Sequence, residues 1–292
     1  MKIATAAYPL DWLDSWAQYE DKIAKWVGDA AGQGADLLVF PEYGAMELST
    51  LAGAEVAADL EQSMHAVSDR MEPVHQLHKA LAAEHGVHIL GASAPVNADH
   101  GRPVNRATFY APTGVSGHQD KQIMTRFERD PWNVVGGDGL QVFETTLGKI
   151  GVLICYDSEF PLLGRALKEA DIILVPSCTE ALSGYWRVRI GAMSRALENQ
   201  CVTAMSSIVG TAPWSQSVDV ATGMGGIFAP PDTGFPMTGV LAEGTMGQPG
   251  WTYADVDPAA IAHVRADGVV LNATHWEEQT PRIKSVTNSS LL

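Results

Sequence analysis

The sequence predicts a mixed α/β fold in which sheets are covered by helices on their outer faces. Short apolar runs alternate with longer segments whose apolar residues recur at helical spacing. Between residues 150 and 207 these segments follow one another as strand, helix, strand, helix and strand, an order typical of parallel sheets. A Pro-Thr-Gly turn in ATFYAPTGV predicts a hairpin before residue 121, so part of the sheet is expected to be antiparallel.

The N-terminal third is expected to supply three strands and two helices. The second strand ends at Pro41, and the second helix ends at Gly86, a residue that often follows a helix. The strands are predicted at residues 2–7, 35–40 and 87–93, and the apolar faces of the helices at Trp16, Tyr19, Ile23, Trp26, Val27 and Ala30, and at Val74, Leu77 and Leu81.

The second half continues this pattern and then becomes irregular. From Gly210 onward Gly and Pro are frequent, with the short strand-like pieces GGIFA, TGVLA and WTYADVD and a short helix after Pro258. One domain is expected over residues 1–277, followed by an exposed tail over 278–292. The central segments are predicted as strands at 150–155, 171–176 and 201–207 and helices at 162–168 and about 186–199.

Composition excludes several classes of partner. With 46% hydrophobic residues the chain can form a large core. Its 19 Lys+Arg against 34 Asp+Glu give a net charge of −15, which repels nucleic acid and anionic lipid surfaces. No apolar run approaches the roughly 20 residues needed to span a bilayer, and MKIATAAYPLDW lacks a long apolar signal segment, so we expect a cytoplasmic protein.

The three cysteines include no CxxC pair, which argues against a disulfide framework or a zinc ribbon. Cys155 ends an apolar strand and precedes YDSEFP and a predicted helix. A turn of this kind exposes a nucleophile at the sheet edge, and the following helix would favour the thiolate. The residue alone fits a buried structural cysteine equally well, and Cys178 and Cys201 are expected to be small core residues.

Two further residues carry suitable chemistry. Glu42 follows the strand LLVFPE and would project into the same edge of the sheet as Cys155. Without a partner residue, a cap of the next segment would be the better interpretation of Glu42. Lys121 lies in HQDKQIMTRFERD, where a solvated surface lysine is the commoner interpretation. Neither residue decides the function by itself.

Together the segments FPE, DKQIMTRFE and ICYDSEFP resemble, in order and spacing, the three signature segments of the nitrilase superfamily of carbon-nitrogen hydrolases. The resemblance runs from KIATAAYP through RALENQCVTAMSS to YADVD and weakens in the tail. It implies an αββα sandwich, two mixed sheets covered by helices, that stacks further on oligomerisation into a homodimer or higher homo-oligomer. It also implies that Glu42 is the general base, Lys121 the oxyanion-stabilising cation and Cys155 the nucleophile, with Glu128 beside them.

The implied reaction is hydrolysis of a small-molecule amide by water. A thiol with a pKa near 8.5 is barely ionised at neutral pH and needs a base or a nearby cation. Lys121 and the backbone N–H of Tyr156 would stabilise the oxyanion, and the cysteine would carry an acyl-thioester. The scheme requires no metal or organic cofactor. The histidine pairs at 75 and 78 and at 85 and 88 lack further ligands that would complete a metal site.

Other residues near the motifs have two interpretations each. Trp132, Tyr156 and Trp186 could line the pocket or pack in the core. Glu159 could repel anionic substrates, or it could pair with an arginine, of which Arg187, Arg189 and Arg195 are candidates.

Two alternatives to an amidase are a catalytically silent scaffold and a hydrolase that acts on nitriles. A catalytically silent scaffold would be expected to have lost one of the three motif residues, and none is lost here. Nitrile-hydrolysing members typically follow the cysteine with Trp-Glu, whereas this chain has Tyr156 and Asp157, which favours amides. The sequence names neither the substrate nor the number of subunits.

Overall fold

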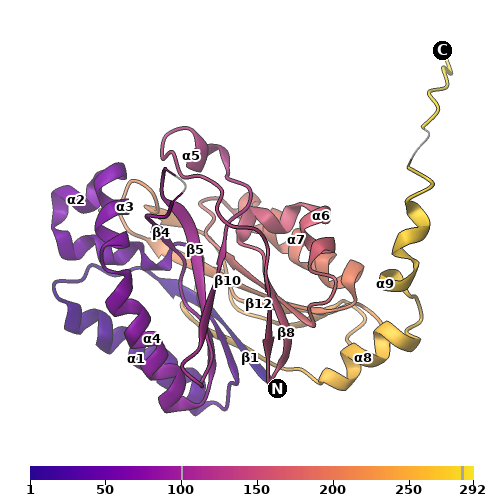
Figure 1. Cartoon of the computed structure of the whole chain (residues 1–292), viewed down its shortest axis with the longest axis horizontal. Helices are drawn as coiled ribbons and strands as arrows, with labels where there is room; N and C mark the ends of the chain where they lie inside the picture. Colours follow the sequence, from indigo (N-terminus) through magenta and orange to yellow (C-terminus); the bar gives the residue numbers. More distant parts are fainter. Residues whose placement is uncertain (100, 284–285) are drawn as a thin grey trace.

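A computed structural model of the chain describes residues 1–99, 101–283 and 286–292. It is a mixed α/β fold, as the sequence predicts. Helices α1 (Trp16–Gly32) and α4 (Met71–His85) lie on one side of the strands and α6 (Pro161–Ala166) and α7 (Leu182–Asn199) on the other, while the chain after α8 (Pro258–Asp267) leads away from the body (Figure 1). The described tail residues are exposed.

The strands form one hydrogen-bonded network that divides into two layers. β1 (Lys2–Pro9) pairs in antiparallel with β14 (Gly250–Asp255) from Lys2 to Ala7, whereas Ala7 to Pro9 pair in parallel with Ser207 to Val209 of β10 (Val202–Thr211). The layers therefore join where β1 and β10 end and separate toward the starts of these strands. This is the expected pair of mixed sheets covered by helices.

The first layer has the order β4-β5-β3-β2-β1, with β6 beside β5 and β14 beside β1. Its remaining strands are β2 (Leu37–Val39), β3 (His88–Leu90), β4 (Ala94–Val96), β5 (Val104–Tyr110) and β6 (Ser116–Asp120). The second layer continues from β10 through β9 (Ile172–Ser177), β8 (Gly148–Val152) and β7 (Val142–Thr145), with β11 (Val220–Ala221) and β12 (Gly226–Phe228) beside β10 and β13 (Val240–Glu243) beside β12.

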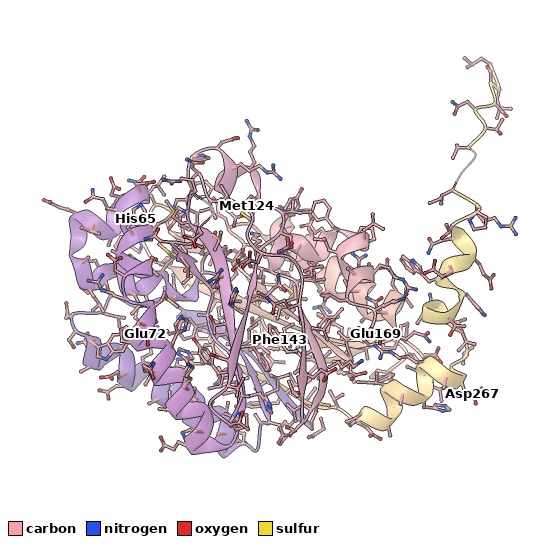
Figure 2. The ribbon with its side chains drawn as sticks, viewed as in Figure 1. His65, Glu72, Met124, Phe143, Glu169 and Asp267 are labelled. Carbon is pink, nitrogen blue, oxygen red and sulfur yellow. The ribbon has the colours of Figure 1, made fainter. Side chains whose placement is uncertain are left out.

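Alternation along the strands sorts side chains between two cores. In β2, Leu38 packs with α1 and α4, whereas its neighbours Leu37 and Val39 belong to the core between the layers. Across that interior Phe143 of β7, labelled in Figure 2, stacks on Phe109 of β5 with ring centroids 5.4 Å apart. The layers thus pack face to face.

The helices mostly follow the predicted apolar faces. In α1 (Trp16–Gly32) Ser15 caps the first turn, and α4 (Met71–His85) ends at Gly86, whose φ of 68° suits glycine. α7 (Leu182–Asn199) begins four residues earlier than predicted. The other helices of the second half are α6 (Pro161–Ala166), α8 (Pro258–Asp267), α9 (Asn272–His275) and the short η3 (Trp276–Gln279).

The segment between Tyr43 and Asp69 carries helices that the sequence analysis did not predict. They are η1 (Gly44–Ala52), α2 (Ala54–Ala58) and α3 (Leu60–Ser68). Most of η1 is buried, so its residues show no helical alternation of apolar and polar types.

Within the described residues, none of the helices is both long and apolar enough to cross a membrane.

Candidate active site

Glu42 is placed by the end of β2. The strand stops at Val39, and after Phe40 and Pro41 the chain turns through Tyr43, whose φ is 55°. The Glu42 carboxylate is almost fully buried. Its Oε1 accepts hydrogen bonds from Lys121 Nζ at 2.6 Å and from Asn105 Nδ2 at 3.0 Å. Two donors therefore hold one carboxylate oxygen in a fixed position.

Lys121 follows the last residue of β6 in the predicted hairpin. Its backbone N–H donates to the carbonyl of Asn105 on β5, so the hairpin pairing positions the side chain. The ammonium contacts both oxygens of Glu128 at 2.8 and 2.7 Å besides Glu42. Lys121 is 1% exposed, so it is not the solvated surface lysine that its residue type alone would favour.

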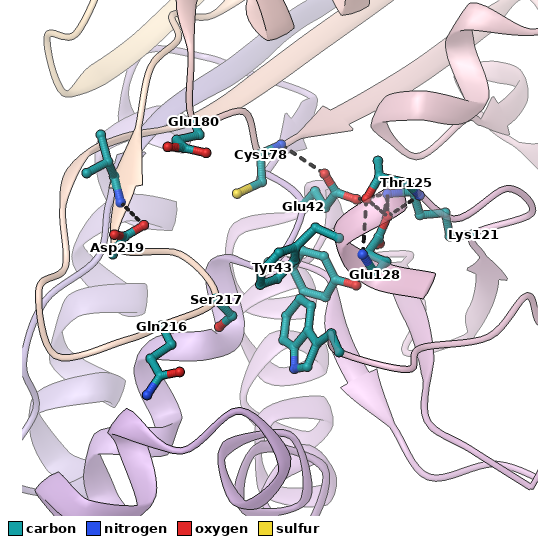
Figure 3. Close-up of a pocket in the computed structure, with 13 residues that line it drawn as sticks. Glu42, Tyr43, Lys121, Thr125, Glu128, Cys178, Glu180, Gln216, Ser217 and Asp219 are labelled. Atoms are coloured by element: carbon teal, nitrogen blue, oxygen red, sulfur yellow. Dashed lines mark hydrogen bonds and ion pairs between the residues drawn. The ribbon is translucent and has the colours of Figure 1, made fainter. Parts of the chain in front are cut away.

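Glu128 is held by the short helix α5 (Arg126–Arg129). Thr125 caps this helix, and the Glu128 carboxylate accepts from both the Thr125 backbone N–H and its hydroxyl at 2.8 Å. The Tyr43 hydroxyl donates to Glu128 Oε1 at 2.8 Å. Figure 3 shows the three charged side chains gathered on one side of the pocket, with Tyr43 beside them.

Cys155 lies in a strained turn. The strand β8 ends at Val152, and Cys155 opens the short helix η2 (Cys155–Glu159) with a φ of 50°. The thiol donates to the carbonyl of Cys178 at 3.8 Å, and the backbone N–H of Cys178 donates to Glu42 Oε2 at 3.0 Å. The main chain of Cys178, which follows β9, therefore touches both the thiol and the carboxylate.

These groups meet because β2, β8 and β9 run in the same direction. β2 is parallel to β1, β1 to β10, β10 to β9 and β9 to β8. Their C-terminal ends consequently share one edge of the two layers, where Glu42, Cys155 and Cys178 follow the strands. The motif residues Glu42, Lys121, Glu128 and Cys155 are brought together as the sequence predicts.

Burial dominates the protonation of the site. Burial and the Glu42 carboxylate raise the pKa of the Cys155 thiol well above its usual range, and Lys121 only partly opposes this. Burial also raises the pKa of Glu42, against the effect of Lys121. The helix start that the sequence analysis expected to favour the thiolate is the short η2, and the pKa of the thiol is nevertheless raised by burial and by Glu42.

The ammonium is the fixed charge of the site. Burial alone would lower the pKa of Lys121, but Glu128 and Glu42 outweigh it and raise this pKa well above the usual value. Burial would likewise raise the pKa of Glu128, yet the contact with Lys121 lowers it. A neutral thiol beside a carboxylate of raised pKa and a permanent cation is an arrangement for proton transfer from sulfur to oxygen.

Two cavities of about 200 and 220 Å³ adjoin these groups. The first is bounded by the charged triad of Glu42, Lys121 and Glu128, and the second by Cys155. Thr125, Cys178 and Glu180 line both and mark where the cavities meet. Cys178 is only partly buried here, so the expectation of a core residue fails for it, whereas Cys201 is fully buried.

Comparisons with known proteins agree with this geometry. A family model described as carbon-nitrogen hydrolase matches residues 2–266. The chain belongs to this family. The probable hydrolase YhcX of Bacillus subtilis is 33% identical over 92% of the chain and 52% of its own length, and nitrilase 3 of Arabidopsis thaliana is 29% identical over 62% and 54%. The chain thus spans about half the length of these relatives.

Solved structures of carbon-nitrogen hydrolases share the fold. That of Helicobacter pylori superposes with a TM-score of 0.72 at 19% identity, covering 91% of this chain and 92% of the other. The amidase of Nesterenkonia sp. AN1, as a mutant with the acetamide moiety of fluoroacetamide added covalently at its active-site cysteine, gives 0.66 at 21% identity, covering 98% and 97%. At these identities the comparison establishes the nitrilase-superfamily fold.

The other predicted residues of this carbon-nitrogen hydrolase fall in different places. Trp132 is buried in the wall of the first cavity, with its indole N–H donating to the carbonyl of Leu60. Tyr156 and Glu159 line the second cavity, and Glu159 pairs with Arg187 at 3.5 Å. Trp186 lies outside the lining of both and is 45% exposed on α7.

Sequence reasoning missed several residues of the site. Asn105 contacts Glu42, Tyr43 contacts Glu128, and Glu180 and Asp219 line the first cavity. Tyr43 directly follows Glu42, so its nearness was a usable signal. The others lie in strands and loops far along the chain, and only the fold brings them to this edge.

One group of possible metal ligands occurs among the described residues, formed by His118, Asp120 and Asp138. The Arg106 guanidinium bonds both oxygens of Asp120, at 2.7 and 2.9 Å, so a cation already occupies this place. None of the three lines either of the two cavities described above. The buried His78 has its pKa lowered to about 4 by burial and stacks on Tyr110, which is a packing role.

Proposed function

We propose that the chain is an amidase that releases ammonia or an amine from a linear amide through an acyl-thioester on Cys155. The observation that carries this proposal is the buried contact of Lys121 with Glu42 at 2.6 Å. The main chain of Cys178 links this pair to Cys155, because its N–H donates to Glu42 and its carbonyl accepts from the Cys155 thiol. Family membership limits the chemistry to carbon-nitrogen bonds. Homologues described as omega-amidases, at 25–26% identity, support amides as the substrate class.

In the proposed reaction Glu42 takes the thiol proton as sulfur attacks the carbonyl carbon. Because both groups are buried, the proton leaves the thiol only as the sulfur bonds to the carbonyl carbon of a bound substrate. The carbonyl oxygen becomes an oxyanion, which the Lys121 ammonium and the Tyr156 backbone N–H stabilise by a few kcal/mol. Glu42 then protonates the departing nitrogen, and the carbon-nitrogen bond breaks.

The second half of the reaction uses the same base. Glu42, again ionised, takes a proton from water as its oxygen attacks the thioester carbon. The thioester collapses to a carboxylic acid product, and Cys155 regains its proton. Glu128 is assigned to hold Lys121, which it contacts with both oxygens, and to keep its charge fixed throughout.

The test is release of ammonia or amine from a panel of small amides, carbamoyl compounds and nitriles. We expect turnover of amides and trapping of the acyl group on Cys155 by rapid acid quench and mass spectrometry. Turnover of nitriles with no amide hydrolysis would favour the nitrile alternative. An inert protein whose Cys155 also resists alkylation would favour a silent scaffold.

We also propose that the chain forms a homodimer or higher homo-oligomer through α7. Leu182, Trp186 and Ile190 are spaced by four residues on this helix and are 51%, 45% and 61% exposed. Trp186 is thus assigned to a subunit contact and not to the pocket. Light scattering should give a mass that is a multiple of 31.2 kDa. Ile190→Glu should lower this mass, whereas the control Val115→Glu, at an exposed residue away from α7, should not. A monomeric wild type would contradict the proposal.

A further inference from the structure

The first cavity is strongly acidic on the side that faces the proposed catalytic groups. Glu180, in the loop between β9 and α7, and Asp219, in the loop between β10 and β11, both line it. In Figure 3 these two carboxylates lie across the pocket from Lys121 and Glu128. The far wall of the pocket thus carries negative charge.

The cationic groups that line the cavities already have partners. Lys121 contacts Glu42 and Glu128, and Arg187 of the second cavity pairs with Glu159. Throughout the described chain no arginine, lysine or histidine pairs with Glu180 or Asp219. Among the residues that line the first cavity, four carboxyl groups therefore face one ammonium, so an entering anion would find no free positive group.

The walls between these charges are aromatic and rigid. Trp132 and Tyr43 pack with ring centroids 4.7 Å apart, and each is fixed by a hydrogen bond, to Leu60 and to Glu128 respectively. Phe127 adds a partly exposed ring to the same lining. Aromatic faces combined with carboxylates suit an organic ammonium group, which is attracted to both.

We infer that the substrate of this site is an amide that carries a positively charged amine, held by Glu180 and Asp219 while its carbonyl meets Cys155. This inference rests on the proposed amidase function and specifies its substrate class. Glu180 is central because it lines both cavities and so lies between the triad and the nucleophile's cavity. The earlier candidate, Glu159, is occupied by Arg187 and is not the group assigned here.

The first test compares three amides that share a four-methylene chain. 5-Aminopentanamide ends in an ammonium, hexanamide in a methyl and 5-carbamoylpentanoate in a carboxylate. We expect kcat/KM for ammonia release to be at least fivefold higher for the ammonium than for the methyl compound, and lowest for the carboxylate. Each of Glu180→Gln and Asp219→Asn should lower the ammonium-to-methyl ratio about two- to fivefold, the range for exposed charge pairs.

The control variant is Glu84→Gln, which removes an exposed carboxylate at the end of α4 outside both cavities. It changes net charge by the same amount, so the ratio should stay at the wild-type value. Hydrolysis of hexanamide with an ammonium-to-methyl ratio near one would overturn the inference and leave the amidase proposal standing. A ratio that falls equally in the control would also overturn it.

A second test does not depend on turnover. Wild type and Glu180→Gln are labelled at Cys155 with 2-aminoethyl and 2-sulfonatoethyl methanethiosulfonate, and the rates are assigned by mass spectrometry. Both probes require the same thiolate, so the change in their rate ratio reports the charge around the approach to sulfur. We expect Glu180→Gln to reduce the preference for the cationic probe at least twofold. An unchanged ratio would contradict the inference even if no amide is hydrolysed.

Discussion

The Asp157 carboxylate accepts a 2.8 Å hydrogen bond from the backbone N–H of Ile123. The same carboxylate accepts from the N–H of Gln122 at 3.1 Å. Asp157 belongs to the turn of Cys155, and Gln122 follows Lys121, so this fully buried group ties the nucleophile's turn to the segment of the cation. The position of Cys155 relative to Lys121 therefore depends on a side chain outside the proposed chemistry.

Asp157 makes folding stability depend on pH. Burial raises its pKa from 3.8 to about 7, so the folded protein binds a proton between these values that the unfolded chain releases. This contribution is fully present below about pH 4, is lost as pH rises to about 7, and amounts to about 4 kcal/mol. The melting temperature of Asp157→Asn minus that of wild type should therefore increase as the pH rises from 5 to 8. A difference in melting temperature that stays constant over this pH range would contradict the prediction.

Cys155→Ala should abolish turnover and leave the fold intact, because it removes the nucleophile and little packing. Cys201→Ala is the matched control, since Cys201 is fully buried and lines neither cavity. We expect it to retain activity and to lose about 1 kcal/mol of stability. Ammonia release and thermal unfolding measure both, and normal turnover by Cys155→Ala would rule out the assigned nucleophile.

Glu42→Gln should lower the rate by about two to four orders of magnitude, since it keeps the shape and removes the base. The raised pKa of Glu42 adds a pH signature, because protonation removes the base. The acid limb of kcat/KM in wild type should lie at higher pH than an ordinary glutamate would give. Near-normal activity of Glu42→Gln would mean that another group is the base.

Lys121→Met should be damaging to stability as well as to catalysis. It leaves Glu42 and Glu128 buried without their shared cation, which should lower the free energy of unfolding by about 3 to 5 kcal/mol. Adding Glu128→Gln removes one of the two unpaired charges and should restore part of the stability but none of the activity. Denaturant unfolding of both variants checks this. A double variant no more stable than the single one would argue against buried charge as the cause.

The sequence was sufficient to predict the motif residues and part of the cavity walls, since Trp132, Tyr156 and Glu159 line the cavities, but it did not predict Glu180 and Asp219. Glu42 and Cys155 could be placed at one edge because each follows an apolar strand, and parallel strands end on the same side. Lys121 required the family resemblance, since nothing local distinguishes it from a surface lysine. Glu180 and Asp219 enter from loops whose path depends on tertiary packing. Trp186 was uncertain because an aromatic residue on a helix suits a pocket, a core or an exposed face.

The main chain of Cys178 has a consequence for how this protein could be altered. Its carbonyl and N–H, not its side chain, contact Cys155 and Glu42, so nearly any residue type at this position would preserve both bonds. The side chain meanwhile lines both cavities. The residue type at position 178 can thus vary in size and polarity while both main-chain hydrogen bonds are kept, which makes this position a natural starting point for changing the range of accepted molecules by directed evolution.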